Sequence, residues 1–340
     1  MKTQSIISVL CSLCILCIAE VGAQSAPVLA KGRLFYADGS HDDVYLMSYR
    51  AGTATYRTNL KSLNIIQVKK PKLESIYFYE PDIFSEAMRL YRAKNYVDAR
   101  AKFAECEVTY KAVDSLPDNY ATLAGFYKME CSRRLYDLDA LSSELEKFRK
   151  DGLTRNFQFQ QLEVYALWEA VRLKDWARLD RLAQSWLDRK FPSELRVQIE
   201  YCHALALEQL VKEDATRFEE LIDAYSRVLS ADASASIDLV LKAANSLLRI
   251  YAEDDEVVFV MKNWDPSEER AALAGDQKLI DAIKLVRYYQ QVGFDAIEPL
   301  ADNYEKFLDY DLSNDAPTDD AQPEEAGEEG AAGENSAVEE

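Results

Sequence analysis

Residues 87–103 read AMRLYRAKNYVDARAKF, which contains two helical patterns that meet at the polar residue Asn95. The small residues Ala87 and Ala99 allow two helices to approach closely, and Phe103 follows Ala99 on the same helical face. Asn95 can cap the second helix, because its side-chain oxygen accepts a backbone N–H that has no partner within the helix. This stretch therefore predicts a helical hairpin.

The same junction recurs along the chain at a spacing of 38 to 42 residues, which is typical of stacked helical hairpins. It is found at Asn95-Tyr96, Asp137-Leu138, Asp175-Trp176, Asp214-Ala215, Asp255-Glu256 and Gly293-Phe294. Apolar residues follow three and seven positions later, which places them on one face of each second helix. These pairs are Ala99 and Phe103, Leu141 and Leu145, Leu179 and Ala183, Phe218 and Ile222, and Ile297 and Ala301. The pattern predicts first helices at 82–93, 118–135, 156–173, 194–211, 236–251 and 268–291.

The first hairpin resembles the tetratricopeptide family through the motif Ala87-x2-Leu90-x5-Tyr96-x2-Ala99-x3-Phe103. It departs from that family because Ile83 replaces a frequent Trp and Lys111 replaces the terminal Pro. Its period also exceeds the family's length of about 34 residues. The resemblance implies an α-solenoid of about six hairpins over residues 82–310, a right-handed superhelix with a concave protein-binding face.

Residues 28–80 show short alternating segments that predict a small β-domain ahead of the helices. We expect strands at 32–36, 44–49, 54–58, 65–68 and 75–79. Asp38-Gly39 and Ala51-Gly52 supply the turns, since these residues tolerate the backbone of tight hairpins. The strand spacing suggests a small meander or an SH3-like barrel. The predicted fold class is therefore mainly α, with a tetratricopeptide-like solenoid preceded by a small SH3-like domain.

Residues 1–23 have the features of a signal peptide. One positive charge at Lys2 precedes a 14-residue apolar run, which is too short to span a bilayer that needs about 20 helical residues. Val21-Gly22-Ala23 places small residues before a cleavage point after Ala23, with Ala26 as a second choice. We expect export to the periplasm of a Gram-negative bacterium, or association with its outer membrane, and no transmembrane helix after cleavage. The alternative is an uncleaved amino-terminal anchor.

Three of the six cysteines lie in the leader and three remain, an odd number that excludes a full disulfide framework. Cys106, Cys131 and Cys202 fall in helical, apolar surroundings, and buried free thiols are the default interpretation. Cys106 and Cys131 lie on helices expected to be neighbours, so a disulfide between them is the alternative.

The charge balance excludes a nucleic-acid partner. The 340 residues hold 40 Lys and Arg against 59 Asp and Glu, a net charge of −19 that repels phosphate backbones. Residues 311–340 contain 11 of these acidic residues and no Lys or Arg. Such a composition buries too little apolar surface to offset its ordering entropy, so we expect a disordered acidic tail.

The sequence shows no catalytic constellation. The two histidines, His41 and His203, cannot form a multi-histidine metal site, and Cys202 beside His203 points to another helical face. Glycine-rich phosphate loops and nucleophile motifs are also missing from the sequence. We therefore expect no enzyme activity, no catalytic residue, no metal and no cofactor.

The resemblance places a row of arginine and aromatic side chains on the concave face. Its members are Tyr91, Arg92, Arg133, Arg134, Trp168 and Arg172. Such a row suits carboxylate-bearing peptides, through bidentate hydrogen bonds and stacking. In the alternative, these arginines pair with acidic neighbours of the same chain, such as Glu130 and Asp175.

Two classes of function remain open at this point. The first is an exported scaffold or adaptor of the cell envelope, whose partners are other envelope proteins or peptides. The second is a glycan-binding protein or a polysaccharide-processing enzyme that uses the β-domain or a helical cleft.

Overall fold

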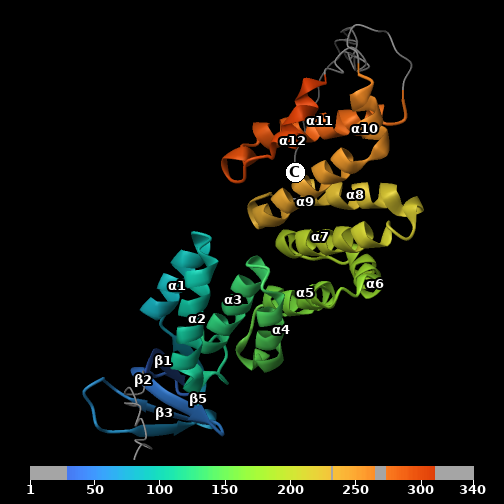
Figure 1. Cartoon of the computed structure of the whole chain (residues 1–340). Helices are drawn as coiled ribbons and strands as arrows, with labels where there is room; N and C mark the ends of the chain where they lie inside the picture. Colours follow the sequence, from blue (N-terminus) through green and yellow to red (C-terminus); the bar gives the residue numbers. More distant parts are fainter. Residues whose placement is uncertain (1–28, 231–232, 265–272, 311–340) are drawn as a thin grey trace, which may run out of the picture. The chain divides into compact units, whose positions relative to one another are not determined.

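The computed structural model describes residues 29–230, 233–264 and 273–310. Both the predicted leader, residues 1–23, and the predicted acidic tail, residues 311–340, lie outside these ranges. Within them the protein is mainly helical, with twelve α-helices that follow a small five-stranded antiparallel sheet (Figure 1). The described residues fall into two compact units, with the boundary between Ala243 and Ala244. No helix in the described ranges has both the length and the apolar character needed to cross a membrane.

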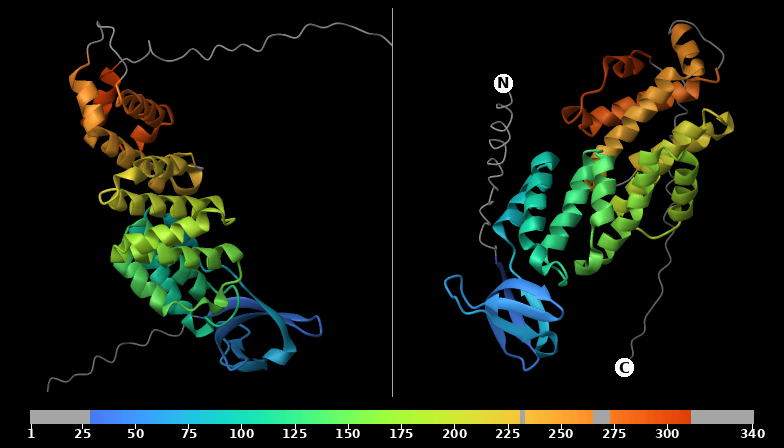
Figure 2. Two further views of the ribbon diagram at one scale, coloured as in Figure 1. Left: turned by 90° about the vertical axis from the view of Figure 1, so that its right-hand side faces the viewer. Right: turned by 60° about the horizontal axis from the view of Figure 1, so that its bottom comes forward.

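The sheet contains five strands in the spatial order β4-β3-β2-β1-β5, and every neighbouring pair is antiparallel. The strands are β1 (Ala30–Tyr36), β2 (His41–Arg50), β3 (Thr53–Arg57), β4 (Ile66–Lys69) and β5 (Leu73–Phe78). A 3₁₀ turn at Lys70–Lys72 joins β4 to β5, and the sheet is strongly curved (Figure 2). Gly39 and Gly52 have φ values of 82° and 73°, which is why glycine follows Asp38 and Ala51 at the two predicted hairpin turns.

The core of the sheet is completed by residues from outside the sheet. Alternate side chains such as Leu34 and Leu46 point inward and are fully buried. Val113 and Leu116, which follow the helix that ends at Tyr110, pack into the same cluster. Small domains bury too little apolar surface on their own, and these two residues add buried apolar surface to the core of the sheet.

Eight helices follow in the first unit, and consecutive helices pack against one another. They are α1 (Asp82–Arg92), α2 (Tyr96–Tyr110), α3 (Tyr120–Arg134), α4 (Leu138–Lys147), α5 (Asn156–Leu173), α6 (Trp176–Leu187), α7 (Ser193–Leu210) and α8 (Phe218–Leu229). The helix α9 (Ala233–Glu253) crosses the boundary between the units.

The first three junctions lie where the sequence predicts them. Helices α2, α4 and α6 each begin directly after Asn95, Asp137 and Asp175, respectively. Each of these side chains accepts the backbone N–H three residues further on, which is the predicted capping bond.

The prediction is wrong for the buried face of the fourth hairpin. A 3₁₀ turn at Ala215–Arg217 precedes α8, so the α-helix begins three residues later than the repeat requires. Leu221 and Tyr225 are buried, whereas Phe218 and Ile222 are only half-buried. The extra turn therefore shifts the apolar face by three positions.

The sixth hairpin also differs from the expectation. The second unit contains α10 (Asp255–Lys262), α11 (Asp276–Gln291) and the short α12 (Asp302–Glu305). Only a 3₁₀ turn forms at Phe294–Ala296, and Ile297 is 53% exposed. Pro299 ends helix formation here, because it lacks a backbone N–H and restricts the residue before it.

Candidate functional site

Two arginines of the predicted row, Arg133 and Arg134, lie at the carboxyl end of α3 and form ion pairs with other residues of the chain. They occupy the last turn of α3, where positive charge is favourable at the end of the helix dipole. Adjacent residues of a helix point in different directions, so the two guanidinium groups contact different partners.

Arg133 lies in the interior and forms an ion pair with Glu130. Its Nη2 donates to Glu130 Oε2 at 3.0 Å, and its Nε donates to Oε1 at 3.2 Å. The guanidinium also lies 5.8 Å from the ring centroid of Trp168, and Tyr165 donates its hydroxyl to Glu130. Burial disfavours the charged carboxylate, but Arg133, Arg134 and the Tyr165 hydroxyl together outweigh it and lower the pKa of Glu130 below its ordinary value. The pair is therefore a charged element of the core.

Through its hydrogen bonds, the side chain of Arg134 connects α3 to α1, α7 and α9. Its Nε donates to the Tyr91 hydroxyl at 3.1 Å, its Nη1 to Asp238 at 2.9 Å and its Nη2 to Glu194 at 2.5 Å. The guanidinium also lies 5.7 Å from the ring centroid of Tyr96. We call Tyr91, Tyr96, Arg134, Glu194 and Asp238 the Arg134 cluster. The side chain of Arg134 is 10% exposed, whereas those of Glu194 and Asp238 are 43% and 26% exposed, so solvent reaches the acidic side of the cluster.

The structure thus brings Tyr91 next to Arg134 and Arg133 next to Trp168. Trp168 is completely buried and donates its indole N–H to Gln198 at 2.9 Å. Two members of the predicted row lie elsewhere, since Arg92 is exposed at the end of α1 and Arg172 pairs with Glu169 and Asp139.

The acidic neighbours named in the alternative behave differently from each other. Glu130 is the partner of Arg133, whereas Asp175 accepts the backbone N–H of Arg178 as the cap of α6.

Cys106 and Cys131 pack in one apolar cluster and are free thiols in this structure, as is Cys202. Burial raises the pKa of Cys106 and of Cys131 to about 12. A thiol with such a pKa is protonated at neutral pH and is a weak nucleophile.

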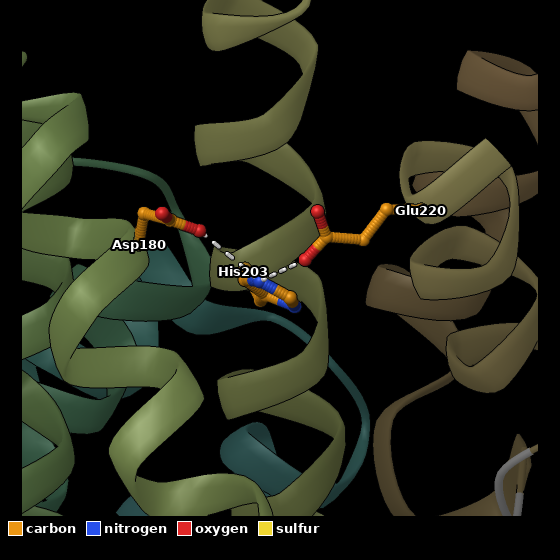
Figure 3. A group of neighbouring side chains, drawn as sticks. All are labelled: Asp180, His203 and Glu220. Carbon is orange, nitrogen blue, oxygen red and sulfur yellow. Dashed lines mark ion pairs between the residues drawn. The ribbon is translucent and has the colours of Figure 1, made fainter. Parts of the chain in front are cut away.

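A second cluster joins three consecutive helices of the first unit. Asp180 of α6, His203 of α7 and Glu220 of α8 point toward one another, with His203 in the middle (Figure 3). Nε2 of His203 lies 3.2 Å from Oδ1 of Asp180 and 3.6 Å from Oε1 of Glu220. The side chain of His203 is 2% exposed, that of Asp180 13% and that of Glu220 38%. Solvent therefore reaches this cluster from the side of α8.

Arg217 and Gln184 hold the two carboxylates in place. Arg217 donates to Asp180 at 3.0 and 3.1 Å and to Glu220 at 2.7 Å. Its hydrogen bond lowers the pKa of Glu220. Nε2 of Gln184 lies 3.2 Å from Asp180 Oδ1 and 3.4 Å from Glu220 Oε1. Burial lowers the pKa of His203, partly offset by the two carboxylates, so the imidazole favours its neutral form.

These residues are far apart in the sequence, so no local pattern around His203 and its neighbour Cys202 indicates the cluster. Two spacings in the sequence could have indicated polar side chains on one helical face. Asp180 and Gln184 are four residues apart, and Arg217 and Glu220 are three residues apart.

Comparison of the chain with protein-family models, with curated proteins and with solved structures gave no match.

Proposed function

We propose that this protein is an exported interaction scaffold of the bacterial cell envelope, which binds a partner protein or peptide on its helical hairpins. The observation that carries the proposal is the recurring hairpin of the first unit, in which α2, α4 and α6 start at capping residues about 40 positions apart. Arrays of this kind offer extended binding surfaces, to which each repeat contributes a few side chains.

Two further features support the finer architecture. The succession of packed hairpins favours a tetratricopeptide-like solenoid over residues 82–310. The strand order β4-β3-β2-β1-β5, with a 3₁₀ turn before β5, favours an SH3-like arrangement of the amino-terminal sheet. The signal-peptide features of the sequence at residues 1–23 support the exported location.

The Arg134 cluster is the candidate contact for a carboxylate of the partner. Arg134 already binds two acidic side chains from α7 and α9, and both of these are partly exposed. A peptide carboxylate can replace Glu194 or Asp238 as acceptor while Tyr91 keeps the guanidinium in place. The partner expected here is therefore an acidic segment that competes with the chain's own carboxylates.

The test uses two variants with opposite expected effects. Arg134→Gln removes the cation, so it should reduce capture of envelope proteins and binding of the acidic peptides derived from them. The double variant Glu194→Gln, Asp238→Asn removes the competing acids, so it should strengthen binding of the same peptides. Arg149→Gln is the matched control, because Arg149 is an arginine with a 62% exposed side chain outside the cluster.

Peptide affinity is measured by fluorescence anisotropy at low and at moderate salt, since contacts between charges weaken as salt rises. Equal peptide affinity in the wild type, in Arg134→Gln and in the double variant would show that the Arg134 cluster is not the contact. Thermal unfolding of each variant shows whether a loss of binding reflects a loss of folding.

A further inference from the structure

We propose that Asp180, His203 and Glu220 form a binding site for a divalent metal ion of the zinc class, held between α6, α7 and α8. The site is separate from the Arg134 cluster and does not depend on the scaffold function.

The spacing of the donor atoms fits such an ion. One nitrogen and two carboxylate oxygens all lie within 4.8 Å of one another. Nε2 of His203 is 3.2 Å from one oxygen and 3.6 Å from the other. Ligand atoms placed about 2.0–2.1 Å from a tetrahedral zinc ion are about 3.3 Å apart. The two nitrogen–oxygen distances already match this spacing, and the two oxygens, which lie within 4.8 Å of each other, would move closer together to share one ion.

The imidazole of His203 points to a missing ligand. Its side chain is 2% exposed, yet neither ring nitrogen has an aligned hydrogen-bond partner among the described residues. A buried polar atom without a partner is rare and costly in proteins. The carboxylates of Asp180 and Glu220 lie on the two sides of Nε2 (Figure 3). An ion between these groups would satisfy the nitrogen and both oxygens together.

The surrounding residues are suited to an outer shell. Arg217 binds both carboxylates and fixes their orientation, which is the role of hydrogen-bonding partners behind metal ligands. The amide of Gln184 faces the same two oxygens. If the side-chain amide of Gln184 is flipped, its carbonyl oxygen faces the ion and becomes the fourth ligand. In the unflipped orientation, a water molecule that enters from the side of Glu220 takes that position.

The donor set determines the class of ion. One imidazole and two carboxylates match the ligands of zinc and its neighbours in the first transition series. Calcium and magnesium are bound mainly through oxygen, with six or more ligands for calcium. Because each ligand comes from a different helix, the ion would connect α6, α7 and α8.

The test measures binding of Zn²⁺ to the chain from Gln24 onward, which lacks the three leader cysteines that could bind zinc themselves. This chain is purified without a histidine tag and stripped of metal. Calorimetry in excess Mg²⁺, which occupies exposed carboxylates, should show one strong equivalent of Zn²⁺. His203→Gln should weaken this binding by at least about 100-fold, and Arg217→Lys by about 10-fold through loss of ligand orientation. His41→Gln is the matched control and should leave the affinity unchanged, since it removes the only other histidine.

The ring protons of the two histidines provide an independent readout by NMR. Zn²⁺ should shift the signals of His203 and leave those of His41 in place. If His203→Gln binds Zn²⁺ as tightly as the wild type, or if no strong equivalent is found, the site is not a metal site and His203 is only a buried partner of two carboxylates. Should His203→Gln unfold, the nearly isosteric Asp180→Asn decides by the same criteria.

Discussion

Replacement of Arg133 by Met should destabilise the first unit by about 3 kcal/mol, the lower end of the range for breaking a buried ion pair. The side chains of Arg133 and Glu130 are 0% and 5% exposed, so the carboxylate left behind cannot turn to bulk water. The value lies at the lower end because Tyr165 still donates its hydroxyl to Glu130 and the charge of Arg134 remains nearby. Met retains most of the apolar stem of Arg133.

Companion variants separate the interaction energy of the Arg133–Glu130 pair from the effect of each side chain alone. Glu130→Gln leaves the guanidinium of Arg133 buried without its counter-charge and should cost a similar amount. The double variant removes both charges and should cost less than either single change. Because each single change costs about 3 kcal/mol, the coupling energy should then be about 3 kcal/mol or more. Arg172→Met is the control and should cost much less, because its ion pair with Glu169 is accessible to solvent.

Urea unfolding monitored by circular dichroism and tryptophan fluorescence measures these differences, and Trp168, one of the four tryptophans, lies beside Arg133. A loss below about 1 kcal/mol for Arg133→Met, or additive effects in the double variant, would refute the description of this pair as one buried unit. The result also matters for binding studies, because a change at Arg133 would alter folding before it altered any surface.

Three further predictions concern the core, the histidine and the thiols. Phe103→Ala should cost about 3–5 kcal/mol in urea unfolding, because its fully buried ring leaves a cavity, whereas exposed Val97→Ala should change little. With a chelator present, the wild type should lose stability relative to His203→Gln as the pH falls below about 6.5. The pKa of His203 is lower in the folded state than in the unfolded state, so protons bind the unfolded state more tightly. A stability difference that stays constant across this pH window would contradict the neutral, buried imidazole. Cys106, Cys131 and Cys202 should react slowly with a thiol reagent in the native chain and quickly after unfolding. Mass spectrometry locates the labelled residues, and rapid labelling of these three thiols in the native chain would argue against their burial.

The starts of the helices were predictable because capping is local. Asn95, Asp137 and Asp175 each bind a backbone N–H only three residues away, so the signal is complete within one short segment. The two errors have different causes. The sequence spacing did not reveal the 3₁₀ turn before α8, and the repeat period was extended past Pro299, which a helix does not tolerate.

The sites were less predictable, because their residues come from distant segments. The row of Tyr91, Arg133, Arg134 and Trp168 was identified by analogy of position, but position along a helix does not state how deeply a side chain is buried. Arg134 binds Glu194 and Asp238, which lie 60 and 104 residues further along the chain. No local pattern encodes a pairing at that separation.

By itself, the sequence determined the charge of the chain, its change from strands to helices near Pro81, and the capped starts of α2, α4 and α6. These properties depend on composition or on contacts within one helical turn. Only the tertiary structure decided that Arg133 is buried with Glu130, that Arg134 joins α1, α3, α7 and α9, and that Asp180, His203 and Glu220 converge. The physical reason is that such contacts depend on how helices pack, which is set by the side-chain volumes of all their neighbours together.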